Sequence, residues 1–346
     1  MGVVNMIYAP SNLLLQWHIT ERCNLRCTHC YQDNYARNEL SFEHLLNILE
    51  QFKTLLATLT ERHGKPIHAH ITVTGGEPFA RQDFLDLLEI FAAHHSLFSF
   101  AILTNGSFID AKMARHLKKL APRFVQVSLE GTETTHDNIR GKGSFAQTIA
   151  AIKHLRRERI VTMISFTAHR TNFQEFSEVA KIGRQLRVNK VWADRLIPWG
   201  SGSNLREQVM SPAETKAFFE IMYQSQQQAK RAWFNKTEIA MHRALQFLVA
   251  GGQPYRCTAG DSLLTVQPNG DLYPCRRMPI RVGNLLETPL LELYDNAELL
   301  HQLRNPQPTN KKCQNCFYAK FCRGGLKCLS YATTGDPFTA DPGCWL

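Results

Sequence analysis

Three cysteines near the start of the chain, Cys23, Cys27 and Cys30, have the spacing C-x3-C-x2-C and follow an apolar run at 13–19 that predicts a strand. Cysteine thiolates hold iron–sulfur cubes, and three of them would leave one iron open for another ligand. Structural zinc normally takes four protein ligands, and no fourth Cys or His lies nearby at zinc spacing. A zinc site completed by a distant residue and unligated core cysteines are the alternatives.

The other seven of the ten cysteines lie between residues 257 and 344, so two cysteine-bearing ends flank a cysteine-free body. Thiols stay reduced in the cytoplasm, where such cysteines indicate metal or redox chemistry before disulfides. The first residues have no basic region of a signal peptide, and no apolar run approaches the ~18 residues of a membrane span. We therefore expect a soluble, cytoplasmic protein that makes no use of a membrane.

The formal net charge of +10 suggests an anionic partner, which could be an acidic peptide, a nucleic acid or a phosphorylated small molecule. The basic residues are scattered, with only short runs such as Lys118-Lys119 and Arg156-Arg157. This distribution favours a solvated basic surface over nucleic-acid binding.

Alternating strand and helix patterns fill the first 200 residues. The predicted strands are 13–19, 67–74, 97–103, 124–129, 160–167 and 188–196, and the predicted helices are 42–56, 83–95, 111–120, 145–159 and 173–186. Alternation of this kind predicts parallel strands joined by right-handed crossovers. Eight such units would close a full barrel, so six predict a partial (β/α)6 barrel.

Unusual residues gather where these strands end. They are the three cysteines, Gly75, Gly76, Glu77, Asn105, Ser128 and Arg195. The carboxyl ends of parallel strands form the rim on which active sites are built. Motifs that are distant in sequence should therefore meet at one opening.

The rest of the chain divides into two further segments. Residues 201–254 predict a polar linker followed by bridging helices, one starting at Ser211-Pro212-Ala213-Glu214 and running to about 233, the other at 238–249. Residues 255–346 predict a hairpin at 264–275 with an Asn-Gly turn, followed by closely spaced thiols. The predicted domains are thus 1–200, 201–254 and 255–346.

Taken together, the motifs resemble the radical SAM superfamily with a C-terminal SPASM domain. The motifs that carry the resemblance are C-x3-C-x2-C, Gly75-Gly76-Glu77-Pro78, Ser128-Leu129-Glu130-Gly131, His136-Asp137-Asn138-Ile139-Arg140 and the C-terminal cysteines. The resemblance covers the chain from about residue 13. It implies an α/β fold, in which a partial (β/α)6 radical SAM barrel is followed by a helical bridge and a small cysteine-rich SPASM domain.

The resemblance also implies cofactors and their ligands. A [4Fe-4S] cluster on Cys23, Cys27 and Cys30 would bind S-adenosylmethionine (SAM) and cleave it reductively to a 5′-deoxyadenosyl radical. The expected SAM contacts are as follows: Gly75 and Gly76 through close backbone approach, Glu77 to the ammonium, Asn105 and Ser128 to the ribose or carboxylate, Arg140 to the carboxylate, and His29 beside the adenine. Hydrogen bonds within turns compete for Asn105 and Ser128, and a surface salt bridge competes for Arg140.

By the same resemblance, Cys313, Cys316, Cys322 and Cys344 would hold one auxiliary [4Fe-4S] cluster, and Cys257, Cys275 and Cys328 would hold another. Cys328 follows Cys322 by more residues than the family pattern has, and the second set lacks a fourth thiolate. That cluster could take a different ligand such as Asp261, have an open iron, or be absent. Zinc sites of the ribbon type are the alternative for this segment.

The leading functional hypothesis is modification of a ribosomally made peptide by cross-link formation or a related oxidation. Its expected partners are a precursor peptide, whose leader would suit the basic surface if acidic, and a one-electron reductant of the flavodoxin or ferredoxin kind. Because only 22 residues precede Cys23, a separate leader-binding protein or another surface would recognise the leader. Alternatives are a formylglycine-forming sulfatase maturase, an enzyme of cofactor or antibiotic biosynthesis, and a non-enzymatic zinc or electron-transfer protein. Asp194, Arg195 and Trp199 are the expected substrate contacts, with buried ion-pair and core roles as alternatives.

Overall fold

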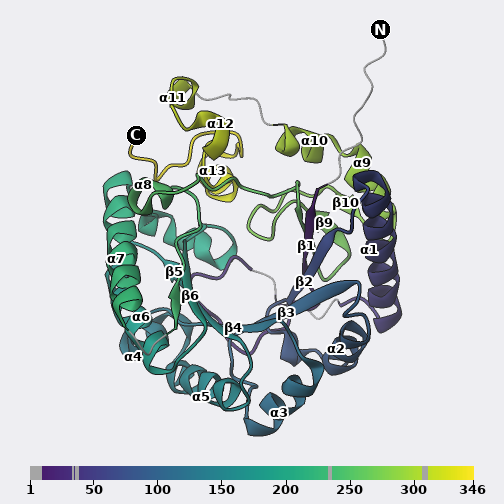
Figure 1. Ribbon diagram of the computed structural model, residues 1–346, viewed down its shortest axis with the longest axis horizontal. Coiled ribbons are helices and arrows are strands. Elements are labelled where there is room, and N and C mark those ends of the chain that lie inside the picture. The colour runs from purple at the N-terminus through teal and green to yellow at the C-terminus, as the bar shows by residue number, and fades with distance from the viewer. Residues whose placement is uncertain (1–9, 33–34, 36–38, 233–235, 306–310) are drawn as a thin grey trace.

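The computed structural model describes residues 10–32, 35, 39–232, 236–305 and 311–346. Its strands form one sheet in the order β10-β9-β8-β1-β2-β3-β4-β5-β6-β7 (Figure 1). The strands are β1 (Asn12–His18), β2 (His68–Thr74), β3 (Phe98–Thr104), β4 (Phe124–Ser128), β5 (Thr162–Ala168), β6 (Lys190–Arg195), β7 (Glu238–Ile239), β8 (Leu263–Val266), β9 (Asp271–Tyr273) and β10 (Gly283–Asn284). The strands β8, β1, β2, β3, β4, β5, β6 and β7 lie parallel to their neighbours in this order. The pairs β8–β9 and β9–β10 are antiparallel.

Helices cover the outer face of the curved sheet and leave its inner face toward a central opening (Figure 1). They are α1 (Phe42–His63), α2 (Phe84–Ala93), α3 (Ala111–Leu120), α4 (Glu133–Arg140), α5 (Ser144–Arg157), α6 (Phe176–Gln185), α7 (Pro212–Arg231), α8 (Phe247–Ala250), α9 (Leu290–Asn296), α10 (Glu298–Arg304), α11 (Lys311–Gln314), α12 (Ala319–Cys322) and α13 (Lys327–Thr334). Three 3-10 helices are η1 (Pro78–Ala80), η2 (Phe173–Glu175) and η3 (Gly200–Gln208). Among the described residues, no helix is both long and apolar enough to cross a membrane. The α/β fold with a partial barrel is confirmed.

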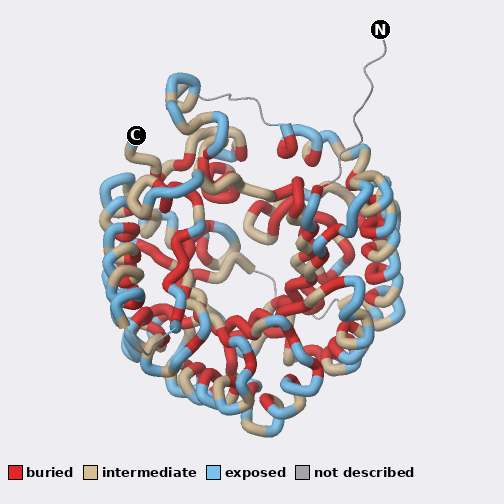
Figure 2. The backbone as a smooth tube through the Cα atoms, viewed as in Figure 1, coloured by how far each residue is buried: buried red, intermediate tan, exposed pale blue. Residues whose placement is uncertain are grey.

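Strand periodicity separates the core from the opening. On β1, Leu13, Leu15 and Trp17 are fully buried, whereas Leu14 and Gln16 between them are less so. Successive strand residues point to opposite faces, so the buried set meets the helices; the Trp17 ring lies 6.0 Å from that of Phe91 on α2. The main core therefore lies between sheet and helices, where Figure 2 shows buried backbone.

Local sequence signals place the helix ends. The Ser41 side chain accepts from the His44 N–H at 3.2 Å at the start of α1, and Gly64 ends that helix with a φ of 67°. Ser211 and Glu214 form a complete capping box at the start of α7, as predicted. The predicted end of this helix near residue 233 lies outside the described residues, as do residues 1–9, where no signal peptide is predicted.

Two predictions about the bridge are wrong. Residues 238–249 do not form a helix, because Glu238–Ile239 joins the sheet as β7: the Glu238 N–H donates to Asn189 O at 2.9 Å, and Ala240 N–H donates to Val191 O at 2.9 Å. Only Phe247–Ala250 is helical there. The supposed irregular linker after residue 200 is instead the 3-10 helix η3.

The cysteine-rich segment continues the barrel sheet. β8 lies parallel to β1, with Leu14 opposite Leu263 and Trp17 opposite Val266. The predicted hairpin is confirmed as β8 and β9, with residues 267–270 as its turn. The predicted domain boundaries remain a prediction, but one sheet passes through all three segments.

Candidate active site

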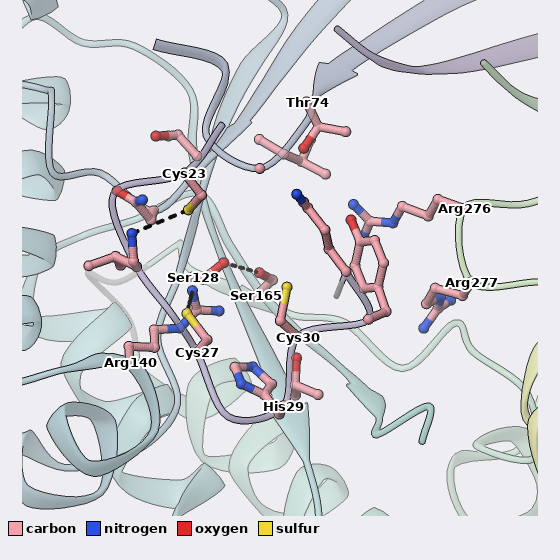
Figure 3. A pocket seen from close by; sticks show the side chains of 18 of the residues that line it. Cys23, Cys27, His29, Cys30, Thr74, Ser128, Arg140, Ser165, Arg276 and Arg277 are labelled. Atoms are coloured by element: carbon pink, nitrogen blue, oxygen red, sulfur yellow. Dashed lines mark hydrogen bonds between the residues drawn. The ribbon is translucent and has the colours of Figure 1, made fainter. Parts of the chain in front are cut away.

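A cavity of about 1110 Å³, its open mouth included, lies at the carboxyl ends of the strands. The predicted site residues that line it are Cys23, Cys27, His29, Cys30, Gly75, Gly76, Asn105, Ser128, Arg140, Asp194 and Arg195. Motifs that are distant in sequence thus lie around one cavity, as expected (Figure 3).

The cysteine loop is held on several sides by backbone contacts. The Thr28 N–H donates to Ile139 O near the end of α4 at 3.0 Å, and the Gly202 N–H of η3 donates to Cys30 O at 2.7 Å. A Cβ on Gly200 would lie 2.3 Å from Tyr31 O, so only glycine fits there. The 3-10 helix that follows β6 therefore packs directly on the loop.

The three thiols are partly exposed within this loop. Burial raises the pKa of the Cys23 thiol to about 11, although the Leu25 N–H donates to its sulfur at 3.4 Å. Thiolates, not thiols, bind metals, so loading of the loop must release protons. Among the described residues, no three His, Cys, Asp or Glu side chains surround one point as ligands of a single metal ion. The donor set is three soft sulfurs at one end of an open cavity, which fits an iron–sulfur cluster with a free position.

Gly75 and Gly76 follow β2 and contact the segment that precedes Cys23. A Cβ on Gly75 would lie 2.5 Å from Thr20 O, and one on Gly76 would lie 2.4 Å from Arg22 O. The Gly76 N–H donates to Thr20 O at 2.8 Å. The glycines thus permit close approach of two protein segments as well as bordering the cavity.

Glu77 does not line the cavity. It is fully buried, and its carboxylate accepts from Thr104 Oγ1 at 2.8 Å and from the Asn105 N–H at 2.7 Å. Burial raises the pKa of this carboxyl to about 7, while these donors oppose the shift. The geometry makes Glu77 a residue that holds the turn after β3; it does not place the carboxylate at a ligand ammonium.

Glu130 is the centre of a buried ion-pair network beside the cysteine loop. Arg140 Nε donates to Glu130 Oε1 at 3.1 Å, and His29 Nε2 lies 3.3 Å from the same oxygen. The Thr167 N–H donates to Glu130 Oε2 at 2.7 Å. Burial alone would raise the pKa of Glu130, but Arg140 and His29 outweigh it and hold the pKa well below its usual range. The carboxylate therefore stays charged.

Arg140 reaches from this network to a thiol. Its Nη1 lies 3.6 Å from Cys27 Sγ, within range of a hydrogen bond to sulfur. The expected pairing with a ligand carboxylate thus competes with a buried protein partner, not with a surface salt bridge. His29 lines the cavity as expected, and its Nδ1 is buried without a hydrogen-bond partner.

Period-two alternation brings polar side chains of β4, β5 and β6 into the cavity. The pairs that line it are Gln126 and Ser128, Ser165 and Thr167, and Trp192 and Asp194. Ser165 Oγ lies 3.5 Å from Ser128 Oγ. Asn105 is tied into local bonds, since its Oδ1 accepts from the Ser107 N–H at 2.8 Å and its Nδ2 donates to Asn24. Asn105 thus makes the hydrogen bonds within a turn that were the alternative to a ligand contact.

Asp194 and Arg195 have buried protein partners. Asp194 accepts from Arg243 Nη2 and Arg277 Nη1, each at 2.7 Å. Burial would raise the pKa of Asp194, but the two guanidinium groups hold it well below its usual range. Arg195 makes a two-pronged pair with Asp341, at 2.7 and 2.6 Å.

These pairs link the barrel to the segments after it, as the alternative ion-pair role anticipated. A carboxylate neutralised by two arginines is a poor general base, so these contacts favour the ion-pair alternative. The expected catalytic or substrate-contact role of Asp194 and Arg195, both of which line the cavity, stays a prediction. Trp199 does not line the cavity and packs on Tyr331, with ring centroids 5.7 Å apart.

Arg276 and Arg277 follow Cys275 and enter the cavity from the cysteine-rich segment, opposite Cys27 and Arg140 (Figure 3). The guanidinium of Arg276 lies 5.7 Å from the centre of the Tyr31 ring. Burial and Arg276 together lower the pKa of His18, which packs edge-on against Tyr31, to about 3. Within the described part of the chain, no carboxylate pairs with Arg276.

The seven C-terminal cysteines form the two sets that the sequence predicts. Cys313, Cys316, Cys322 and Cys344 line one small apolar cavity of about 360 Å³. Cys257 and Cys328 lie close enough to Cys275 for its charge to raise the pKa of both their thiols, although burial is the larger cause. Arg277 lies beside Cys328 and also lines the main cavity, so the three-thiol set lies next to a residue of the cavity wall.

Asp261 does not approach the three-thiol set through any described contact. One of its oxygens pairs with Arg256, and the other, Oδ1, is buried without a hydrogen bond. Burial raises the pKa of its carboxyl to about 6. Its suggested role as a fourth ligand gains no support from this position.

Four residues that the sequence did not single out belong to the site or its frame: Glu130, Arg276, Arg277 and Asp341. Glu130 lies inside a recognised motif, and its place after β4 could have identified it. The two arginines directly follow Cys275, but no sequence pattern shows that this turn faces the barrel.

Comparison with known proteins agrees with this geometry. The Radical SAM superfamily profile matches residues 17–182, and the SPASM iron–sulfur cluster-binding domain matches residues 257–317. The chain is 27% identical to the AdoMet-dependent heme synthase of Methanosarcina barkeri, over 99% of this chain and 98% of the relative. It is 28% identical to the mycofactocin maturase MftC of Mycobacterium ulcerans, over 96% and 82%.

Solved structures share the fold. The peptide-bound structure of anSMEcpe with AdoMet has a TM-score of 0.76 at 17% identity, covering 96% of this chain and 94% of that one. Streptococcus suis SuiB bound to its precursor peptide SuiA has a TM-score of 0.72 at 17% identity, covering 97% and 76%. This chain therefore belongs to the radical SAM superfamily and carries a C-terminal SPASM domain, and its cofactors are a [4Fe-4S] cluster, SAM and auxiliary clusters.

Proposed function

We propose that this enzyme modifies an anionic, ribosomally made peptide by cross-link formation or a related oxidation. The observation that carries the proposal is Arg276, a cation in the cavity wall that has no acidic partner among the described residues. It faces the cysteine loop across the opening, so a carboxylate bound to it would hold a substrate against that loop.

Cys23, Cys27 and Cys30 would hold the cluster that binds SAM. When bound, the cluster and SAM supply one-electron cleavage of a sulfonium and a carbon radical that abstracts hydrogen from the substrate. Ser128, Ser165 and Thr167 present hydroxyl groups to the cavity for the polar parts of SAM. The ends of β2 and β3 would form the wall beside it, with Gly75, Gly76 and Asn105.

Arginine suits a peptide carboxylate because its planar fork can donate two parallel hydrogen bonds. The other three arginines of the cavity, Arg140, Arg195 and Arg277, are each paired with a buried carboxylate. Arg276 is thus the cavity arginine whose fork has no carboxylate partner in the described chain. Tyr31, Tyr35 and Trp192 add aromatic surface for side chains of the substrate.

The two C-terminal cysteine sets would hold the auxiliary clusters. Cross-linking removes two hydrogens from the peptide: one leaves as an atom, and the other as a proton and an electron. The three-thiol set of Cys257, Cys275 and Cys328 lies next to Arg277 of the cavity wall, where a cluster would be placed to accept that electron. This arrangement supports an oxidation over a redox-neutral rearrangement.

The test is turnover with peptides encoded beside the gene. Reconstituted, reduced enzyme with SAM and the correct peptide should give 5′-deoxyadenosine and a peptide that has lost the mass of two hydrogens. Absence of peptide-dependent turnover with every such peptide would overturn the proposal.

A matched pair of variants tests the role of Arg276. Arg276→Ala should raise KM for the peptide about tenfold with kcat nearly unchanged, because it removes a charge-assisted contact worth ~1.5 kcal/mol. Arg281→Ala is the control, since Arg281 lies on the same segment and pairs with Asp271 and Glu287 outside the cavity. Equal KM values for the two variants would show that Arg276 does not bind the substrate.

A small polycarboxylate is the second candidate, favoured by the same arginine and by likeness to heme synthases over almost the whole chain. A macrocycle bearing carboxylates could pair with Arg276 and stack on Trp192. Iron coproporphyrin III, added in place of the peptide, distinguishes the two candidates. If SAM cleavage depends on this compound, and if the mass of the compound changes during the reaction, the second candidate is favoured.

A further inference from the structure

Two exposed phenylalanines are the chain neighbours of cysteines of the four-thiol set. Phe317 directly follows Cys316 and is 87% exposed, and Phe321 directly precedes Cys322 and is 62% exposed. Leu346, 54% exposed, also borders the small cavity that these thiols line. We call these two phenylalanines, together with the aliphatic Leu346, the aromatic surface. It lies with α11, α12 and the C-terminus at the rim, away from the central opening (Figure 1).

Such exposed apolar side chains are unusual on a surface that contacts only solvent. Large apolar side chains that are mostly exposed and close in sequence mark contact sites for partners. Tyr318 between them is turned inward, with its ring 4.9 Å from that of Phe247. The segment is thus anchored by one aromatic residue while two others point outward.

The chain segment that carries Phe317 and Phe321 is basic, although Arg304 and Lys327 within it are buried. The carboxylate that lines the neighbouring cavity, Asp341, is buried as well. Between Glu298 and Asp336 the sequence has no Asp or Glu and six Lys or Arg, namely Arg304, Lys311, Lys312, Lys320, Arg323 and Lys327. Lys312 and Lys320 are exposed. A basic rim around an apolar centre is complementary to an acidic protein with an apolar contact patch.

We propose that the aromatic surface docks an acidic one-electron carrier protein of the flavodoxin type. Radical SAM chemistry consumes an electron at the start of turnover, and docking here would bring the carrier's redox group beside the four-thiol set. The exchange is one electron: the carrier is oxidised, the enzyme is reduced, and no bond forms or breaks. Electron-transfer encounters are typically small and charge-steered, which suits an isolated pair of phenylalanines with a basic rim.

Binding of flavodoxin to the reconstituted enzyme without any peptide tests the proposal. The double variant F317S/F321S should weaken the Kd at least about tenfold, since it removes most of the apolar contact. Lys320→Glu should weaken binding and also flatten its dependence on salt. Phe108→Ser is the control, because Phe108 is another exposed phenylalanine, located on the barrel.

Iron content, thermal unfolding and dithionite-driven SAM cleavage should be unchanged in all of these variants, which separates docking from damage to the fold. A flavodoxin Kd unaffected by F317S/F321S would overturn the proposal. Loss of self-association in sedimentation velocity, with flavodoxin binding intact, would assign the surface to a second copy and would also overturn it. Because no peptide is present, neither result bears on the proposed substrate.

Discussion

Glu130 shows how one buried carboxylate can position the cysteine loop. Its backbone N–H donates to His136 Nδ1 at 3.1 Å, and its carboxylate contacts Arg140, His29 and the Thr167 N–H. These partners come from the cysteine loop, α4 and the end of β5. The residue therefore ties three elements that each border the cavity.

Glu130→Gln should loosen the cysteine loop. The amide keeps the shape but leaves Arg140 as a buried cation without a counter-charge, which typically costs ~3–5 kcal/mol. We expect a lower thermal midpoint and SAM binding at least about tenfold weaker, measured by calorimetry and by the EPR response of the reduced cluster to SAM.

Glu175→Gln provides the matched control for that variant. Glu175 accepts from the Thr132 N–H at 2.7 Å in the same loop after β4, but it contacts neither Arg140 nor the cysteines. Loss of SAM binding in both variants would mean that the whole loop, rather than the Glu130–Arg140 pair, matters.

At the scale of the element, β2 carries a half-buried histidine, His70. His70 Nδ1 lies 2.8 Å from Ser99 Oγ on β3, and its ring stacks on Phe124 at 5.7 Å. Burial, with help from Arg123, lowers the pKa of His70 to about 4. The unfolded chain therefore binds this proton more readily than the folded one between about pH 6.5 and 4.

Proton uptake by the unfolded chain lowers the free energy of unfolding as the pH falls through this range. Stability that is fully present above pH 6.5 should fall as the pH drops toward 4, by up to ~3 kcal/mol from this residue. His70→Asn keeps the bond to Ser99 and cannot be protonated, so its unfolding midpoint should fall less between pH 7.5 and 5 than that of the parent protein. His68→Asn, at an exposed position on the same strand, should behave like the parent; if His70→Asn does too, the linkage is wrong.

The elements also show how far the sequence alone could go. The capping box at Ser211 and the Ser41 cap were readable because they depend on residues within one turn of each other. Residues 238–249 were not readable in this way, because Glu238 pairs with Lys190 of β6, a strand much earlier in the chain. This long-range pairing overrides local helical spacing. α4 was missed because its sequence is mostly polar, with Ile139 and His136 as its buried contacts.

The same limit applies to the site. The thiol spacing and the strand-end motifs predicted which residues would meet, because parallel strands present their carboxyl ends together. Sequence did not show which side of each residue faces the cavity. Gly76 borders the cavity and also accommodates Arg22 O, and Glu77 accepts a hydrogen bond from Thr104 Oγ1. The ligand contacts expected of both residues stay predictions.

At the scale of the whole molecule, the barrel and the SPASM segment share one sheet and buried ion pairs. β8 covers the edge of β1 that would otherwise be unpaired. On the other side of the opening, Arg195 at the end of β6 binds Asp341, whose oxygens also accept from the Leu326 and Gly343 N–H groups, each at 2.9 Å. The rim of the cavity is thus closed from both ends of the sheet.

This closure predicts a specific pattern of stability. Arg195→Leu should cost ~3–5 kcal/mol, since it leaves the Asp341 carboxylate buried without its cation. Adding Asp341→Leu should recover part of that loss by removing the charge, but not all of it, because two backbone N–H groups then lose their acceptor at ~1–3 kcal/mol each. Denaturant unfolding of the two single variants and the double variant measures the coupling.

An exposed pair serves as the reference for this cycle. Glu178→Ala removes the partner of Lys181 on the solvent face of α6, where both side chains are about half exposed, and should leave the midpoint unchanged. If Arg195→Leu were as mild as Glu178→Ala, the pair would not join the two segments. If it is severe, the retention of auxiliary iron should fall with it, because Asp341 also borders the cavity of Cys313, Cys316, Cys322 and Cys344.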